Sequence, residues 1–99
     1  MGQTTDPNQE VAEAARQEAL DVLSKAATFD DLVNGIRSVY EKRRPRHGHE
    51  AAQLLNFLEF KDPTKVVDVP LDLVRAALSR IAKNDPGDAR PAEFLKLIR

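Results

Sequence analysis

The chain has 99 residues, no cysteine and a formal net charge of −1 from 15 basic and 16 acidic residues. This length is typical of one domain, and the lack of cysteine excludes disulfides and thiolate metal sites. The nearly balanced charge argues against a protein whose whole surface binds nucleic acid or anionic lipid. No apolar run approaches the roughly 20 residues that span a bilayer. Because residues 1–6 are also polar and lack the pattern of a secretion signal, we expect a cytoplasmic protein without membrane contact.

The N-terminal part predicts a short tail followed by a long helix. We expect residues 1–7 to be a disordered tail and residues 8–99 to form a single helical domain. Asp6 is suited to cap the first helix and Pro7 to occupy its first position, where a missing N–H costs nothing. The sequence that follows, to about Ala27, is rich in Ala, Glu, Gln and Leu, which are strong helix formers.

A second helix is predicted from about Phe29 to Lys42. Thr28 and Asp31 match a capping box in which Asp replaces the usual Glu, and this pattern marks the start of the helix. Gly35 lies inside it and costs about 1 kcal/mol relative to Ala. A close crossing with another helix is the simpler explanation for this glycine, and a hinge is the alternative.

The most apolar stretch of the chain lies at about 50–61 and predicts a third helix. Its apolar residues cover most of the helix circumference, and they are Ala51, Leu54, Leu55, Phe57, Leu58 and Phe60. Such a helix needs several neighbours to cover it. We therefore expect it to be the central core helix, with the other helices packed around it.

The C-terminal part predicts a loop and two further helices. Residues 61–69 form the longest connection, and a helix with a clear apolar stripe follows from about 69 to 83. The run 84–88 contains Asp-Pro-Gly, a strong turn signal, and a short helix opens near 90. The whole pattern predicts a compact all-α bundle of about five helices.

Residues 42–49 form the most basic segment, which we call the basic elbow. Its basic and histidine residues are Lys42, Arg43, Arg44, Arg46, His47 and His49. Three interpretations remain open: a solvated charge cluster that offsets a helix dipole, a surface for an acidic protein partner, or a phosphate-binding surface for nucleic acid. Nucleic acid is the less favoured partner, because no aromatic residues alternate with the arginines to stack on bases.

Chemical motifs are weak. His47, His49 and Glu50 could form a metal site, but the spacing is not typical of structural zinc, and we expect no metal and no cofactor. The chain has no nucleophile motif and no glycine-rich phosphate loop, so we expect no enzymatic activity. In a helix-turn-helix motif the second helix must be polar to enter a DNA groove. The second helix of the pair at 29–60 is apolar, which disfavours that motif here.

The remaining feature is the apolar C-terminal segment, which contains Phe94, Leu95, Leu97 and Ile98. These residues either complete a closed core or leave a patch for a partner helix or a second copy of the chain. The leading hypothesis is a non-enzymatic protein-interaction module, such as a small adaptor, inhibitor or regulatory subunit. It would use an apolar patch with a basic rim, formed by Lys42, Arg43, Arg44, Arg46, His47, Phe94, Leu95 and Ile98. The alternative is a nucleic-acid-associated protein that uses residues 42–49 on phosphates.

Overall fold

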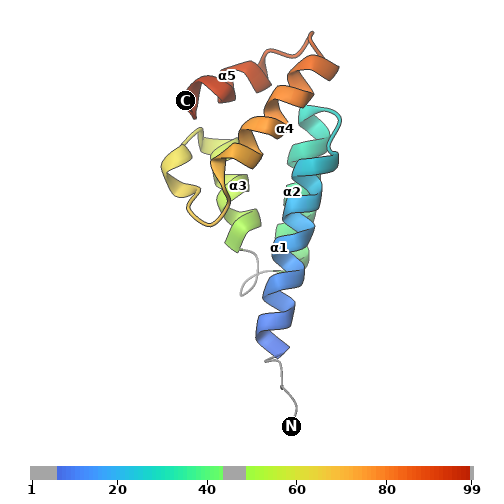
Figure 1. The fold of residues 1–99 in the computed structure, drawn as a ribbon, viewed down its shortest axis with the longest axis vertical. Coiled ribbons are helices and arrows are strands. Elements are labelled where there is room, and N and C mark those ends of the chain that lie inside the picture. Colours follow the sequence, from blue (N-terminus) through green and yellow to red (C-terminus); the bar gives the residue numbers. More distant parts are fainter. Residues whose placement is uncertain (1–6, 44–48, 99) are drawn as a thin grey trace.

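The computed structural model describes residues 7–43 and 49–98, which fold into five α-helices and one 3₁₀ helix without any strand (Figure 1). The elements are α1 (Pro7–Lys25), α2 (Phe29–Arg43), α3 (His49–Phe60), η1 (Pro63–Lys65), α4 (Leu71–Asn84) and α5 (Arg90–Leu97). The predicted all-α bundle is confirmed. Apart from Pro7, the residues predicted to form a tail lie outside the described ranges. In these ranges, no helix combines the length and apolar character that crossing a membrane requires.

Local hydrogen bonds set two of the helix boundaries. The hydroxyl of Thr28 accepts a hydrogen bond from the backbone N–H of Asp31 at 3.1 Å, which is one half of the predicted capping box. At the end of α3, Lys61 adopts a left-handed backbone with φ of 58°. Its N–H donates to the carbonyl of Phe57 at 2.8 Å and closes the last turn. Lys61 therefore does what a glycine usually does at a helix end.

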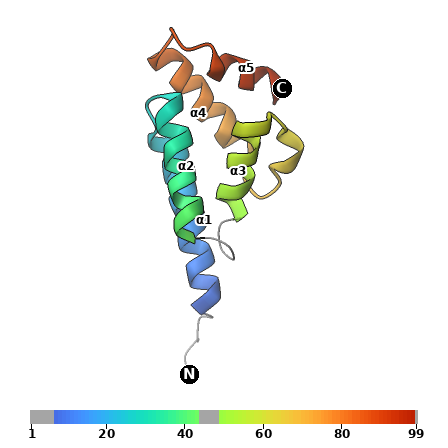
Figure 2. The same ribbon diagram turned by 180° about the vertical axis from the view of Figure 1, so that it is seen from behind.

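Helices α1 and α2 form an antiparallel pair that lies side by side in both views (Figures 1 and 2). They approach closely at Gly35, where an added Cβ would lie only 2.7 Å from a methyl carbon of Val22. A side chain at position 35 would push the helices apart. This confirms the predicted close crossing at Gly35.

The core forms where α3 and α5 meet the α1–α2 pair. On α3, the side chains of Ala51, Leu54 and Phe57 are buried. The ring of Phe94 from α5 lies edge-on to Phe57 with a centroid distance of 5.0 Å, and stacks on Phe29 of α2 at 5.3 Å. This aromatic contact joins α2, α3 and α5.

One expectation for α3 is wrong. Phe60 is 72% exposed and does not widen a buried face. It lies one turn after Asn56, which is also exposed, so both side chains project from the solvent-facing side of α3. The apolar stretch is therefore covered on one side, and its end remains open.

The connection 61–70 closes the core beneath α3. Val66 and Val69 are buried, and Gln53 of α3 holds the segment between them. The amide oxygen of Gln53 accepts from the backbone N–H groups of Val67 and Asp68, both at 2.9 Å. Its amide nitrogen donates to the carboxylate of Asp68 at 2.6 Å. The predicted loop is thus fixed to α3 by one side chain.

Candidate functional site

The structure describes only part of the basic elbow. Lys42 lies near the end of α2, and its ammonium is 3.1 Å from a carboxylate oxygen of Glu18 on α1. Arg43 is the last residue of α2, but its side chain is not described, and Arg44, Arg46 and His47 lie outside the described ranges. The one cation of the predicted set that can be placed therefore bonds within the molecule, and the partner-binding role of the others stays a prediction.

The apolar residues predicted for the same site lie mainly in the core. Phe94 and Ile98 are buried, and Leu95 is half-buried against the same cluster. The reason is the aromatic contact at Phe94, which fills the space between α2 and α3. For Phe94 and Ile98 the closed-core alternative holds, and the folded surface does not present them to a partner.

The described residues do not bring together the metal site considered at His47, His49 and Glu50. His49 is exposed at the start of α3, and Glu50 faces Arg16 of α1 at 3.9 Å. His47 lies outside the described ranges. Among the residues that the structure describes, no three His, Cys, Asp or Glu side chains gather in a way that could hold a metal ion.

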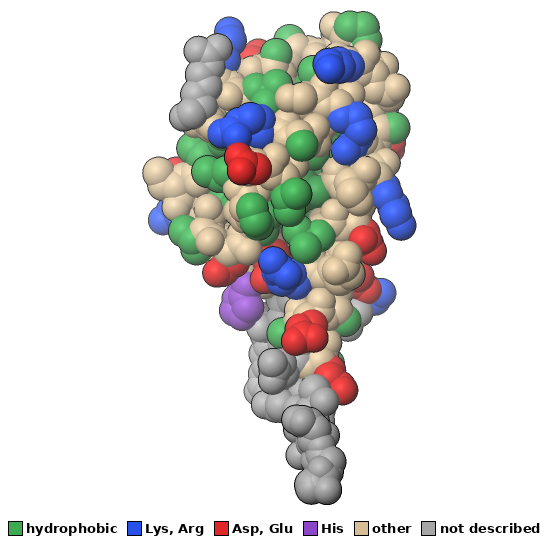
Figure 3. Space-filling view, viewed as in Figure 1, with side chains coloured by type: hydrophobic (Ala, Val, Ile, Leu, Met, Phe, Trp, Pro, Cys, Tyr) green, Lys and Arg blue, Asp and Glu red, His purple; other side chains and the backbone are tan. Residues whose placement is uncertain are grey.

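An apolar surface appears instead where α4 crosses α1, and we call it the α1–α4 groove. It is a shallow hollow of about 120 Å³, lined by Leu20, Leu23, Ser24, Leu73, Ala76, Ala77 and Arg80. The space-filling view shows apolar side chains gathered over α1 and α4, with Lys and Arg side chains on several sides and an acidic side chain close by (Figure 3).

Helical spacing explains why α4 contributes to both the core and this groove. Its core stripe consists of Val74, Ala77, Leu78 and Ile81, all buried. Leu73, Ala76 and Arg80 recur at i, i+3 and i+7, so they form a neighbouring stripe on the same helix. Leu73 is 44% exposed. Because the alanines of α4 are small, the surface beside Leu73 is recessed.

Arg80 closes one end of the groove and is held in place. Its Nη2 donates to the backbone carbonyls of Leu23 at 2.6 Å and Ala26 at 2.9 Å, both at the end of α1. The side-chain amide of Asn84 donates to the carbonyl of Ala27 at 2.8 Å. These α4 side chains therefore satisfy carbonyls in the last turn of α1 and in the connection that follows it, where a positive charge is also favoured. Nη1 and Nε of Arg80 form no hydrogen bond with any described residue.

Two further arginines lie on the same two helices, outside the lining of the groove. Arg16 lies one turn before Leu20 on α1, is half-exposed, and makes only the long 3.9 Å contact with Glu50. Arg75 on α4 contacts Asp72 at 2.7 Å and donates to the carbonyl of Ile98 at 2.8 Å. Arg80 is therefore the charged residue of the groove lining, Arg16 lies one turn away from Leu20 on α1, and Arg75 is paired with an exposed carboxylate.

A second hollow lies beside the exposed Phe60. It measures about 260 Å³ and is lined by Phe60, Asn56, Asp62 and Lys65. Two hydrogen bonds from Thr64 hold the pKa of Asp62 below its usual value. This surface presents one aromatic ring among polar groups of both signs, and isolated exposed apolar residues are common on monomers. It is a weaker candidate than the α1–α4 groove.

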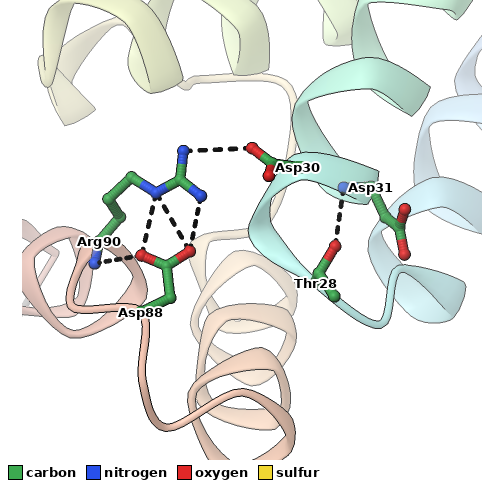
Figure 4. Close-up of polar contacts among 5 residues, drawn as sticks. All are labelled: Thr28, Asp30, Asp31, Asp88 and Arg90. Carbon is green, nitrogen blue, oxygen red and sulfur yellow. Dashed lines mark hydrogen bonds and ion pairs between the residues drawn. The ribbon is translucent and has the colours of Figure 1, made fainter.

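The densest polar cluster of the described residues joins α5 to α2 (Figure 4). Arg90 contacts Asp88 through Nε and Nη2, and its Nη1 lies 3.2 Å from Asp30. Its guanidinium also lies 4.5 Å above the ring of Phe29. Hydrogen bonds from Arg90 lower the pKa of Asp88. The carboxylates of Asp88 and Asp30, which accept these bonds, raise the pKa of Arg90. Because these groups satisfy one another, the cluster has a structural role. We call Arg90, Asp88 and Asp30 the Arg90 clasp.

Sequence reasoning missed the α1–α4 groove because it considered only the core stripe of α4. The available signal was the i, i+3, i+7 stripe of Leu73, Ala76 and Arg80 beside the core stripe. No signal could have placed α1 next to it, since Leu23 and Arg80 are 57 residues apart.

No protein-family model, curated protein or solved structure gives a significant match to this chain.

Proposed function

We propose that the protein is a non-enzymatic interaction module, such as a small adaptor, inhibitor or regulatory subunit, which binds a protein partner through the α1–α4 groove. The observation that carries the proposal is a recessed apolar surface that ends at a fixed arginine. Leu73 supplies exposed apolar area, and Arg80 supplies an oriented cation that needs little further ordering to bind. Arginine beside a desolvated apolar anchor is a frequent arrangement at binding hot spots.

The groove itself favours binding over reaction. Its only hydroxyl is that of Ser24, which donates to the carbonyl of Asp21 at 3.0 Å. The described lining residues therefore offer apolar contact and a positive charge, without a base beside a nucleophile. We keep the expected cytoplasmic location as part of the proposal.

The test compares partner capture by the wild-type chain and by variants of the groove. Leu73→Glu and Ala76→Glu place a negative charge on an exposed position of the α1–α4 groove. Both should reduce recovery of specific partners from the native host by about tenfold or more. Asn34→Glu is the matched control, because Asn34 is an exposed position on α2 outside the groove lining.

Circular dichroism and thermal unfolding show whether each variant keeps the fold. Recovery of the same partners by wild type, both groove variants and the control would refute binding at this groove. Failure of the folded wild type to recover any specific partner would count against the interaction module itself.

The basic elbow has its own test. A combined Arg43→Glu, Arg44→Glu and Arg46→Glu variant should lose partners only if the elbow contributes to the rim. The nucleic-acid alternative instead predicts a mobility shift at low salt whose affinity falls steeply as salt rises. The bond between Lys42 and Glu18 occupies one cation of the elbow and gives this alternative no support.

A further inference from the structure

We infer that the occupant of the α1–α4 groove is an amphipathic helix of a partner protein that carries acidic residues at both ends of its apolar face. This inference rests on the proposed function and specifies the chemistry of the partner. It follows from the shape of the groove and from the positions of Arg80 and Arg16.

The shape favours a helix with one large apolar side chain as its anchor. The groove lies between two helices, and its lining includes Ser24, Ala76 and Ala77, whose small side chains leave a recess. Leu20 and Leu73 stand on either side of this recess. A helix laid along α1 would insert one apolar residue there and place its neighbours at i±3 or i±4 on the two leucines.

The charges at the two ends select an acidic partner. Nη1 and Nε of Arg80 lack a bonded partner among the described residues, while Nη2 is fixed on α1. A fixed guanidinium with open N–H groups is suited to donate hydrogen bonds to a carboxylate. At the other end, Arg16 is half-exposed and makes only a 3.9 Å contact with Glu50.

The distance between these cations gives the expected sequence pattern. Arg80 is anchored on the carbonyls of Leu23 and Ala26, which lie seven and ten residues after Arg16 on α1. At 1.5 Å per residue this corresponds to about 10–15 Å along the helix axis. The partner helix should therefore carry two carboxylates two to three turns apart, with apolar residues between them. A nucleic-acid phosphate would meet the cations but would leave the apolar recess empty.

The experiment uses a random peptide display library selected on the whole wild-type chain, without counter-selection against any variant. Enriched peptides are synthesised, labelled and titrated by fluorescence anisotropy against wild type, Leu73→Glu, Arg16→Glu and Asn34→Glu. Arg16→Glu is used in place of an Arg80 variant, because Arg80 also holds the end of α1. Sedimentation of the unliganded proteins is measured in parallel.

The inference predicts enriched peptides with apolar residues at helical spacing and acidic residues two to three turns apart. Affinity should fall at least about tenfold for Leu73→Glu and about threefold or more for Arg16→Glu, and Asn34→Glu should bind as wild type does. Failure to enrich such peptides, or equal binding to Leu73→Glu, would overturn the inference.

Other outcomes separate the inference from the proposed function. If host partners depend on Leu73 but the enriched peptides are neutral or basic, the interaction site survives and the acidic helix is wrong. If wild type sediments as a dimer and Leu73→Glu as a monomer, the occupant is a second copy of the chain and the inference is also wrong.

Discussion

Lys61 holds a backbone conformation that side-chain-bearing residues rarely adopt. Its φ of 58° ends α3, and the conformation costs a residue with a Cβ about 1 kcal/mol or more. We expect Lys61→Gly to be about 1 kcal/mol more stable than Lys61→Ala, as measured by urea unfolding. Both variants lose the 3.8 Å ion pair with Glu93, so the comparison isolates the backbone. Equal stability of the two variants would contradict this account of the α3 terminus.

Gly35 shows the opposite balance, in which sterics oppose helix propensity. Replacing it by Ala favours helix by about 1 kcal/mol, but the new Cβ would lie 2.7 Å from Val22. We expect Gly35→Ala to destabilise the wild type, because overpacking typically costs about 1–3 kcal/mol.

A double-mutant cycle with Val22→Ala checks the cause. In the Val22→Ala background, Gly35→Ala should stabilise by about 1 kcal/mol, since the opposing methyl groups are absent. If Gly35→Ala stabilises the wild type by that same amount, the two helices do not cross as closely as described.

At the scale of elements, the Arg90 clasp makes the attachment of α5 to α2 sensitive to acid. The folded state lowers the pKa of Asp88 below its ordinary value near 3.8. The ionised carboxylate therefore stabilises the folded protein at pH values above that ordinary pKa. That stability is lost as the pH falls through the lowered pKa.

We therefore expect the free energy of unfolding of the wild type to fall as the pH drops below about 5. Asp88→Asn should be less stable at pH 7 and should lose less stability over the acid range. Arg90→Met is the control, because it removes the partner and leaves the carboxyl group. Parallel acid profiles for wild type and both variants would show that the clasp does not couple to pH.

The boundaries of the elements followed from local sequence. The first four helices begin and end within two residues of their predicted positions, and α5 begins at the predicted position, because prolines, Thr28 and the Asp-Pro-Gly turn act on their immediate neighbours. The bonds that Arg80 and Asn84 donate to α1 were not predictable, since they join residues more than 50 positions apart. The candidate site depends on those bonds, and this is why the sequence pointed to the basic elbow instead.

At the scale of the whole molecule, we expect Phe94 to contribute strongly to stability. It is buried and contacts the rings of Phe29 and Phe57, so it links three helices. We expect Phe94→Ala to cost about 3–5 kcal/mol, a large part of the roughly 5–15 kcal/mol that stabilises a typical domain.

Leu97→Ala on the same helix is the matched control. Leu97 is 39% exposed, and we expect its loss to cost less than about 1 kcal/mol in the same denaturant titration. Similar losses for both variants would mean that α5 packs on the domain through a different face from the one described.

The sequence predicted a compact bundle but not which apolar residues would remain outside it. Phe94 and Phe60 are both phenylalanines in apolar segments, yet one is central and the other faces water. The sequence pattern correctly predicted that Phe94 and Phe60 belong to helical segments. The order in which helices cover one another depends on contacts between distant segments, which a single sequence does not encode in a readable local pattern.

The bonds from Arg80 and Asn84 to α1 also bear on the order of assembly during translation. The α1–α2 hairpin is synthesised first, with the carbonyls of Leu23, Ala26 and Ala27 still hydrated and one face of Phe29 uncovered. Their partners belong to α4 and α5, so the hairpin emerges from the ribosome incomplete. The first pair of helices acquires its final stability only when the last pair has been made and has docked.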